Sequence, residues 1–183
     1  QLRSVFDKIQ RKVILKLYLD ERIVSAELEN YMKTVASLSN KITVEIAQKN
    51  ASSNIAPCVK ICLDDGTETG LAFHGVPGGH EFTSFILGIY NVAGTGQTID
   101  EETKKAVESV TQPTDIKVLV SLSCTMCPDT VVAAQHIAAK NSNVTAEIYD
   151  VQHFDEIKKH DRISKDCTTD GSVKILILIS ISF

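Results

Sequence analysis

The feature that most constrains the fold of this chain is a strand–helix–strand pattern over residues 116–150, with two cysteines where the helix begins. Residues 116–123 (IKVLVSLS) form a largely apolar run, which is typical of a buried strand. Residues 125–140 place small and branched apolar residues on one helix face, and residues 144–150 (VTAEIYD) alternate between apolar and polar. A strand, a helix and a second strand in this order indicate an α/β fold.

The preceding part of the chain carries a longer α/β pattern. Strands are predicted at 12–19, 41–47, 58–63 and 69–75, and the turn sequence DDGT joins the last two. Helices are predicted at 1–10, 22–38, 78–92 and 100–110, with Asp100 as the N-cap of the last. Both parts of the chain therefore contain a strand, a helix and a second strand in that order.

A short polar segment, TQPTD at 111–115, separates the two patterns. We therefore predict two α/β halves, residues 1–112 and 113–183, in preference to one continuous sheet. Beyond residue 150, the sequence predicts a short helix at 153–160 and a strand at 173–183.

Charge and composition exclude several classes of function. The net charge of −4 comes from interspersed acidic and basic residues, so the chain lacks the basic footprint of a nucleic-acid-binding protein. Its longest apolar run, about ten residues, is too short to span a membrane, and we see no signal peptide. Five cysteines, an odd number, argue against a secreted disulfide scaffold. We expect a cytoplasmic protein with reduced or catalytic thiols.

The two cysteines lie where a dithiol can react. Cys124 ends a predicted strand, and Cys127 lies in the first turn of the following helix, close enough for their sulfurs to form a disulfide. The free N–H groups and positive dipole at a helix start stabilise a thiolate. Pro128 suits a first-turn position, which has no intrahelical N–H bond to lose. We predict that Cys124 attacks and Cys127 resolves the mixed disulfide, without a metal or organic cofactor.

Zinc binding and simple packing are the alternatives for this pair. A zinc site normally needs two more ligands, and no second C-x-x-C is present. Cys58 and Cys62 lie on one face of a predicted strand with α-carbons about 13 Å apart, too far for a disulfide, so we predict buried small side chains. Cys167 lies in a predicted loop and is assigned no role.

Two longer stretches carry a resemblance to a known family: FHGVPGGHEFTSFILGIYNVAGTG (73–96) and SLSCTMCPDTVVAAQHIAAKNSNV (121–144). Together they resemble the N-terminal domain of the flavoprotein subunit of bacterial alkyl hydroperoxide reductase. That domain consists of two fused thioredoxin-like folds, of which only the second has a working dithiol. The resemblance therefore implies a three-layer α/β/α architecture with mixed sheets. It also implies that residues 1–112 lack a redox dithiol and that 113–183 form a second fold that is incomplete at its C-terminus.

The family's function follows as an expectation. The resemblance implies a protein-disulfide oxidoreductase that passes electrons from a flavoprotein dithiol to the disulfide of a peroxiredoxin, which reduces peroxides. It implies FAD and NAD(P)H in a C-terminal domain of the parent protein, and no cofactor in these residues. The expected partners are the peroxiredoxin and the reductase domain of the same chain, with a homodimer through the parent protein. The alternative is a non-catalytic thioredoxin-like binding or scaffold domain.

The resemblance also suggests site residues. Cys124 and Cys127 match the redox pair, and Glu81 in GHEF matches an acid near the dithiol. Without the resemblance, Glu81 reads as an acid at a helix N-terminus. Thr125 and Met126 depart from the residues often found between the family's cysteines, and we expect both, with Pro128, to contact the partner.

A second departure concerns a proline. The family has a Val-Pro pair with a cis proline facing the dithiol, but this chain has no proline after Pro128. The chain therefore departs from the family at the cis-proline wall of the site.

Overall fold

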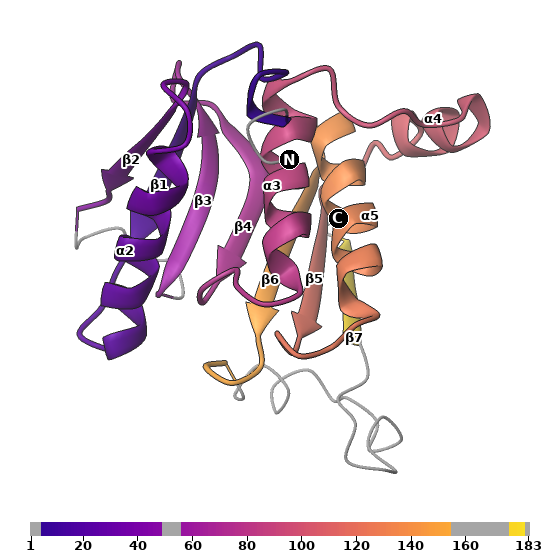
Figure 1. Ribbon diagram of the computed structural model, residues 1–183. Coiled ribbons are helices and arrows are strands. Elements are labelled where there is room, and N and C mark those ends of the chain that lie inside the picture. The colour runs from indigo at the N-terminus through magenta and orange to yellow at the C-terminus, as the bar shows by residue number, and fades with distance from the viewer. Residues whose placement is uncertain (1–4, 49–55, 155–175, 182–183) are drawn as a thin grey trace.

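The computed structural model describes residues 5–48, 56–154 and 176–181. Seven strands form one sheet in the order β2-β1-β3-β4-β6-β5-β7 (Figure 1). The strands are β1 (Val13–Tyr18), β2 (Ile42–Ile46), β3 (Cys58–Leu63), β4 (Glu68–His74), β5 (Thr114–Val120), β6 (Val144–Asp150) and β7 (Leu176–Ile181). The helices are α2 (Ile23–Ala36), α3 (Glu81–Ala93), α4 (Glu101–Glu108) and α5 (Cys127–Lys140).

The two parts of the chain repeat one arrangement. In the first, β1 pairs in parallel with β2 and antiparallel with β3. In the second, β5 pairs in parallel with β6 and antiparallel with β7. The predicted α/β fold with a mixed sheet is confirmed.

The prediction of two halves in preference to one continuous sheet was wrong. Strands β4 and β6 pair in parallel, with Leu71 opposite Ala146 and Phe73 opposite Ile148, so a single sheet crosses both parts. The sequence could not reveal this pairing, because strand periodicity defines which face of a strand is buried but not which strand lies beside it. The boundary at residues 112 and 113 stays a prediction.

The main core lies between the sheet and three helices. Helices α2, α3 and α5 lie side by side in front of the sheet in Figure 1. Apolar residues at alternate positions of the strands point toward these helices, because successive side chains of a strand face opposite sides. In β5 and β6 this row consists of Ile116, Val118, Val120, Val144, Ala146 and Ile148.

Most predicted elements are present within a few residues of their expected bounds. Residues 5–10 are an exception, because only Val5 and Phe6 are helical and Ile9 instead forms a bridge with Gly94. Of the helix predicted at 153–160, residues 155–160 lie outside the described residues, and 153–154 are not helical. Over the described ranges, no helix is long and apolar enough to cross a membrane.

Several loops that bear on function meet at one edge of the sheet. Strands β1, β5 and β6 end at this edge, and α2 and α5 begin there (Figure 1). The chain enters β3 here as well, after a cis peptide bond between Ala56 and Pro57. The C-terminal edge of parallel strands is where α/β folds usually place their sites.

Candidate functional site

The predicted cysteine pair lies at this edge, at the start of α5. Cys127 is the first residue of the helix, and Cys124 lies in the preceding loop. The two form a disulfide with their α-carbons 5.6 Å apart. Cys127 is fully buried in the main core, whereas Cys124 is only partly buried. A partner therefore reaches Cys124 more easily than Cys127.

The start of α5 leaves its backbone N–H groups available to the dithiol. The Cys124 N–H donates to the Ser121 carbonyl at 2.9 Å, which turns the loop back before the helix begins. Met126 occupies the N-cap position without a side-chain cap hydrogen bond, and Pro128 lies in the first turn. Uncapped N–H groups and the helix dipole favour an anion at this end, which is the condition that lowers a thiol pKa.

The residues between the cysteines face outward. Thr125 is exposed, Met126 is 68% exposed, and Pro128 is partly buried. An apolar side chain this exposed beside a disulfide gives a partner something to contact without blocking access to Cys124.

Glu81, the acid suggested by the resemblance, is fully buried at the first residue of α3. The Ser84 hydroxyl donates to Oε2 of Glu81, whereas Oε1 is buried without a hydrogen-bond partner. Burial raises the pKa of Glu81, because a buried carboxylate loses the solvation of its charge; the Ser84 hydrogen bond and the nearby His80 act in the opposite direction. A carboxyl with a raised pKa keeps its proton to a higher pH than an exposed one, which suits a group that donates or accepts protons.

The segment before Glu81 joins α3 to the dithiol loop. The His80 N–H donates to the Leu122 carbonyl at 3.1 Å. Gly79 has a φ of +55°, and a β-carbon built there would lie 2.6 Å from the same carbonyl oxygen. Only glycine therefore fits the close approach of the two loops. The structure thus brings Glu81 and the dithiol loop to the same edge.

Asp150 is a buried acid at this edge that was not predicted from the sequence. Only 1% of it is exposed, and it continues the row of β6 residues that face the helices. It accepts a hydrogen bond from the Gln152 N–H at 3.0 Å, and its Oδ2 lies 3.9 Å from Nε2 of His153. Burial raises the pKa of Asp150, and the Gln152 N–H and the His153 ring oppose this rise. The available signal was an acid in the buried register of VTAEIYD.

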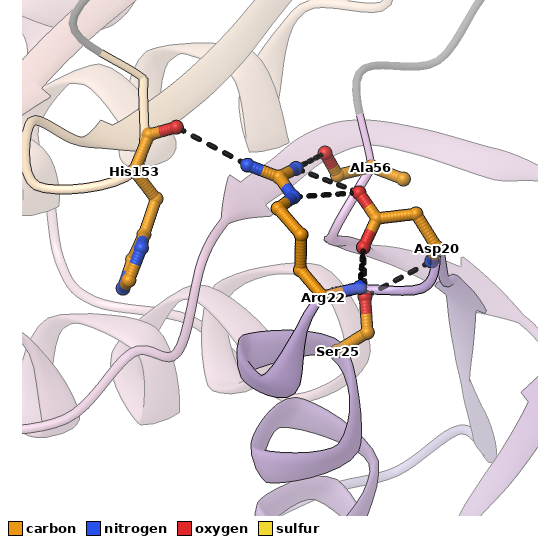
Figure 2. A network of polar contacts seen from close by, with 5 residues as sticks. All are labelled: Asp20, Arg22, Ser25, Ala56 and His153. Atoms are coloured by element: carbon orange, nitrogen blue, oxygen red, sulfur yellow. Dashed lines mark hydrogen bonds and ion pairs between the residues drawn. The ribbon is translucent and has the colours of Figure 1, made fainter.

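A second feature that was not predicted is a polar network around Arg22, shown in Figure 2. Arg22 Nε donates to Asp20 Oδ2 at 2.8 Å, and Ser25 Oγ donates to Asp20 Oδ1 at 2.7 Å. The guanidinium also donates to the Ala56 carbonyl and, at 3.3 Å, to the His153 carbonyl. These contacts join three segments that are far apart in the sequence.

The other cysteines of the described ranges are not a redox pair. Cys58 and Cys62 are free and buried, as predicted. Burial strongly raises the pKa of Cys58, and its Sγ lies 3.8 Å from Nε2 of His74. A thiol this buried does not ionise near neutral pH, so Cys58 is not a nucleophile. Cys167 lies outside the described residues.

Zinc binding, the alternative for the cysteine pair, requires further ligands around the two sulfurs. Across residues 5–48, 56–154 and 176–181, no group of three or more His, Cys, Asp or Glu side chains could hold a metal ion. The dithiol therefore has no additional ligands among these residues.

Comparisons with known proteins agree with the geometry. A family model of the thioredoxin domain matches residues 114–164. The N-terminal domain of alkyl hydroperoxide reductase AhpF from Enterococcus faecalis is 34% identical and superposes with a TM-score of 0.86, over 100% of this chain and 90% of that one. The F subunit of alkyl hydroperoxide reductase from Pseudomonas aeruginosa is 30% identical over 148 residues, which are 79% of this chain and 27% of that protein.

A relative from Bacillus subtilis carries a different name, NADH dehydrogenase. It is 30% identical over 150 residues, which are 82% of this chain and 28% of that protein. The chain thus spans less than a third of the length of these curated relatives.

Proposed function

Because this chain belongs to the family of N-terminal domains of alkyl hydroperoxide reductase AhpF, we propose that it is a thiol–disulfide oxidoreductase module. The observation that carries the proposal is the Cys124–Cys127 disulfide at the start of α5, with one sulfur accessible and the other buried. In the proposed reaction, the module takes electrons from a flavoprotein dithiol and gives them to a peroxiredoxin disulfide.

The exchange needs only the two cysteines and the partner disulfide. The Cys124 thiolate attacks one sulfur of the partner disulfide, which forms a mixed disulfide and releases a partner thiolate. Cys127 then loses its proton and attacks Cys124, which forms the intramolecular disulfide and releases the second partner thiolate. The dithiol is oxidised by two electrons and the partner disulfide is reduced by two. Thr125, Met126 and Pro128 contact the partner during this exchange.

Glu81 is proposed to handle protons during the exchange. It is a buried carboxyl beside the dithiol loop, held by Ser84 and otherwise unpartnered at Oε1. A neutral carboxylic acid can donate a proton to a leaving thiolate, and its carboxylate can accept one from a thiol. A charged Glu81 also disfavours a nearby thiolate, so its protonation state affects when the dithiol ionises.

The remaining components belong to the parent protein. We propose that FAD and NAD(P)H bind to a reductase domain that follows this module in the same chain, and that the parent protein forms a homodimer in the cytoplasm of a bacterium. The module itself is proposed to need no cofactor for thiol exchange.

A single-turnover assay tests this function. The reduced protein is mixed with an oxidised peroxiredoxin, the reaction is stopped with acid, and new thiols are alkylated and counted by mass spectrometry. The wild-type protein should transfer two electrons to each disulfide, and neither Cys124→Ser nor Cys127→Ser should complete the transfer. Full transfer by either variant would rule out the two-cysteine mechanism. No transfer by the wild-type protein would favour a non-catalytic scaffold domain.

A further inference from the structure

We propose that Arg22, His153 and Asp150 form a network through which the first part of the chain sets the pH at which Cys124 becomes a thiolate. The inference rests on the proposed function, because it concerns the reactivity of the same dithiol. It assigns Arg22 and His153 as positioning residues and Asp150 as the buried charge on which they act.

Asp150 lies close to the dithiol loop. In the pairing of β5 with β6, Asp150 stands opposite Val120, and the Val151 N–H donates to the Val120 carbonyl at 2.9 Å. The dithiol loop starts at the next residue and folds back on itself through the Cys124 N–H bond to Ser121. Adjacent strands and one tight turn place the carboxylate roughly 10 Å from Cys124.

Asp150 is enclosed by the ends of two neighbouring strands. On one side, a β-carbon built at Gly75 would lie 3.0 Å from the Asp150 β-carbon, so the end of β4 is in close contact with it. On the other side is Val120 of β5. The carboxylate is therefore buried between two strand ends, and within the described residues its polar partners come from the turn after β6.

Arg22 holds that turn in place from the other part of the chain. Its guanidinium donates to the His153 carbonyl (Figure 2). Its Cζ also lies 5.5 Å from the centre of the Phe154 ring. The hydrogen bonds to Asp20 and to the Ala56 carbonyl hold the guanidinium in place. With its backbone and its neighbour Phe154 held, His153 keeps its ring beside Asp150.

The position of Arg22 in the fold supports this function. The buried residues Val24 and Leu28 of α2 correspond in spacing to Cys127 and Val131 of α5. When Val24 is aligned with Cys127, Arg22 aligns with Thr125, which lies between the two cysteines. The first part of the chain thus has a fixed arginine where the second has a reactive loop.

Other charged groups also lie at this edge. They are Asp20 and Glu21 before α2, His74 of β4, His80 and Glu81 at the start of α3, and Asp129 in the first turn of α5. Asp150 differs from the exposed ones because it is buried, where a charge is screened less. At about 10 Å and an effective dielectric constant of about 20, one charge changes a thiol pKa by roughly one unit.

The test measures the pH dependence of Cys124 alkylation in the reduced full chain. Asp150→Asn removes the negative charge and keeps the size and the acceptor for Gln152, so the alkylation midpoint should fall by about 0.5–1 pH unit. Arg22→Met removes the contact that holds His153, so the negative charge of Asp150 is less compensated by the His153 ring. The alkylation midpoint should therefore rise. Arg22→Met in the Asp150→Asn background should have no further effect, because Arg22 acts through Asp150. Arg11→Met is the matched control, since Arg11 pairs with Asp64 and Asp65 at a similar exposure, without the bonds to Ala56 and His153.

An unchanged midpoint in Asp150→Asn would overturn the inference, as would an Arg22→Met shift that persists in full when Asp150 is absent. Equal shifts in Arg22→Met and Arg11→Met would also overturn it, because they would reflect net charge alone. These outcomes are separate from a failure of the proposed function, in which the wild-type protein would not reduce the peroxiredoxin at any pH.

Discussion

Met126 offers a direct test of partner docking at the scale of one side chain. It is 68% exposed beside the disulfide, and burying its thioether against a partner should contribute about 1 kcal/mol. Met126→Gln should therefore raise the KM for a peroxiredoxin about fivefold and leave the reduction of a small aromatic disulfide unchanged.

Ile23 provides the matched control for Met126. It is 81% exposed at the start of α2, which begins at the same edge as α5 but is separated from it by α3 (Figure 1). Ile23→Gln should leave both rates unchanged. Equal losses in the two variants, or a loss with the small disulfide as well, would show that Met126 is not a specific docking contact.

Glu81 gives a prediction about stability and pH. Its pKa in the folded protein is raised by burial, so the folded state binds its proton more tightly than the unfolded chain does. The stability linked to this group is present below the unfolded pKa, near 4, and is lost as the pH rises through the raised folded pKa.

Urea unfolding between pH 4 and 8 measures this linkage. The free energy of unfolding should fall more steeply with rising pH in the wild-type protein than in Glu81→Gln, which has no proton to lose. The comparison uses slopes, so a constant offset from the buried amide does not affect it. Glu102→Gln, on exposed α4, should keep the wild-type slope, and an identical slope in Glu81→Gln would contradict the burial argument.

At the scale of the elements, the contact between the loop before α3 and the dithiol loop depends on Gly79. A β-carbon there would clash with the Leu122 carbonyl oxygen and would also disfavour the positive φ. Gly66 separates the two effects, because its φ is +84° and a β-carbon there would meet nothing within 4 Å.

Gly79→Ala should lower the free energy of unfolding by more than Gly66→Ala does, with the difference on the order of 1–3 kcal/mol. Chemical denaturation of the two variants measures it. Equal losses would show that the two loops can separate without effect on stability.

The elements themselves were largely predictable. The alternation of KITVEIA, the turn DDGT and the cap Asp100 each identified an element that the structure contains, because these signals are local. The cysteine pair was predictable for the same reason. Arg22 was not predicted, because its contacts with the Ala56 and His153 carbonyls form only when these segments approach in the folded chain. Asp150 was missed although a local signal existed, namely an acid in the buried register of VTAEIYD. Glu81 was found through a family resemblance, since its local pattern indicates only a helix N-terminus.

At the scale of the whole molecule, the sheet is continuous across the two parts of the chain. Side chains of β4 and β6 are also in contact. The rings of His74 and Tyr149 are stacked, with their centres 3.9 Å apart. The sequence indicated a break near residue 113 because a polar linker and a repeated pattern usually mark a domain boundary. That reasoning could not reveal the β4–β6 pairing, because the pattern of a strand does not identify the strand that lies beside it.

Hydrogen exchange can detect whether the sheet behaves as one cooperative unit. The amides of β1, β3, β4, β5 and β6 should open with one common free energy under native conditions, because no sheet edge lies between the two parts. Two groups of amides, divided between β4 and β6, would show instead that the parts unfold separately.

The central claim is that Cys124 attacks the partner and Cys127 resolves the intermediate, and trapping that intermediate tests it most directly. The reduced Cys127→Ser and Cys124→Ser proteins are each mixed with an oxidised peroxiredoxin, quenched with acid and examined by intact-mass spectrometry and peptide mapping. Cys127→Ser should accumulate a covalent complex with the peroxiredoxin through Cys124, because no resolving thiol remains. Cys124→Ser should form none, because Cys127 is fully buried. A complex through Cys127 in Cys124→Ser, or no complex with either variant, would contradict the claim.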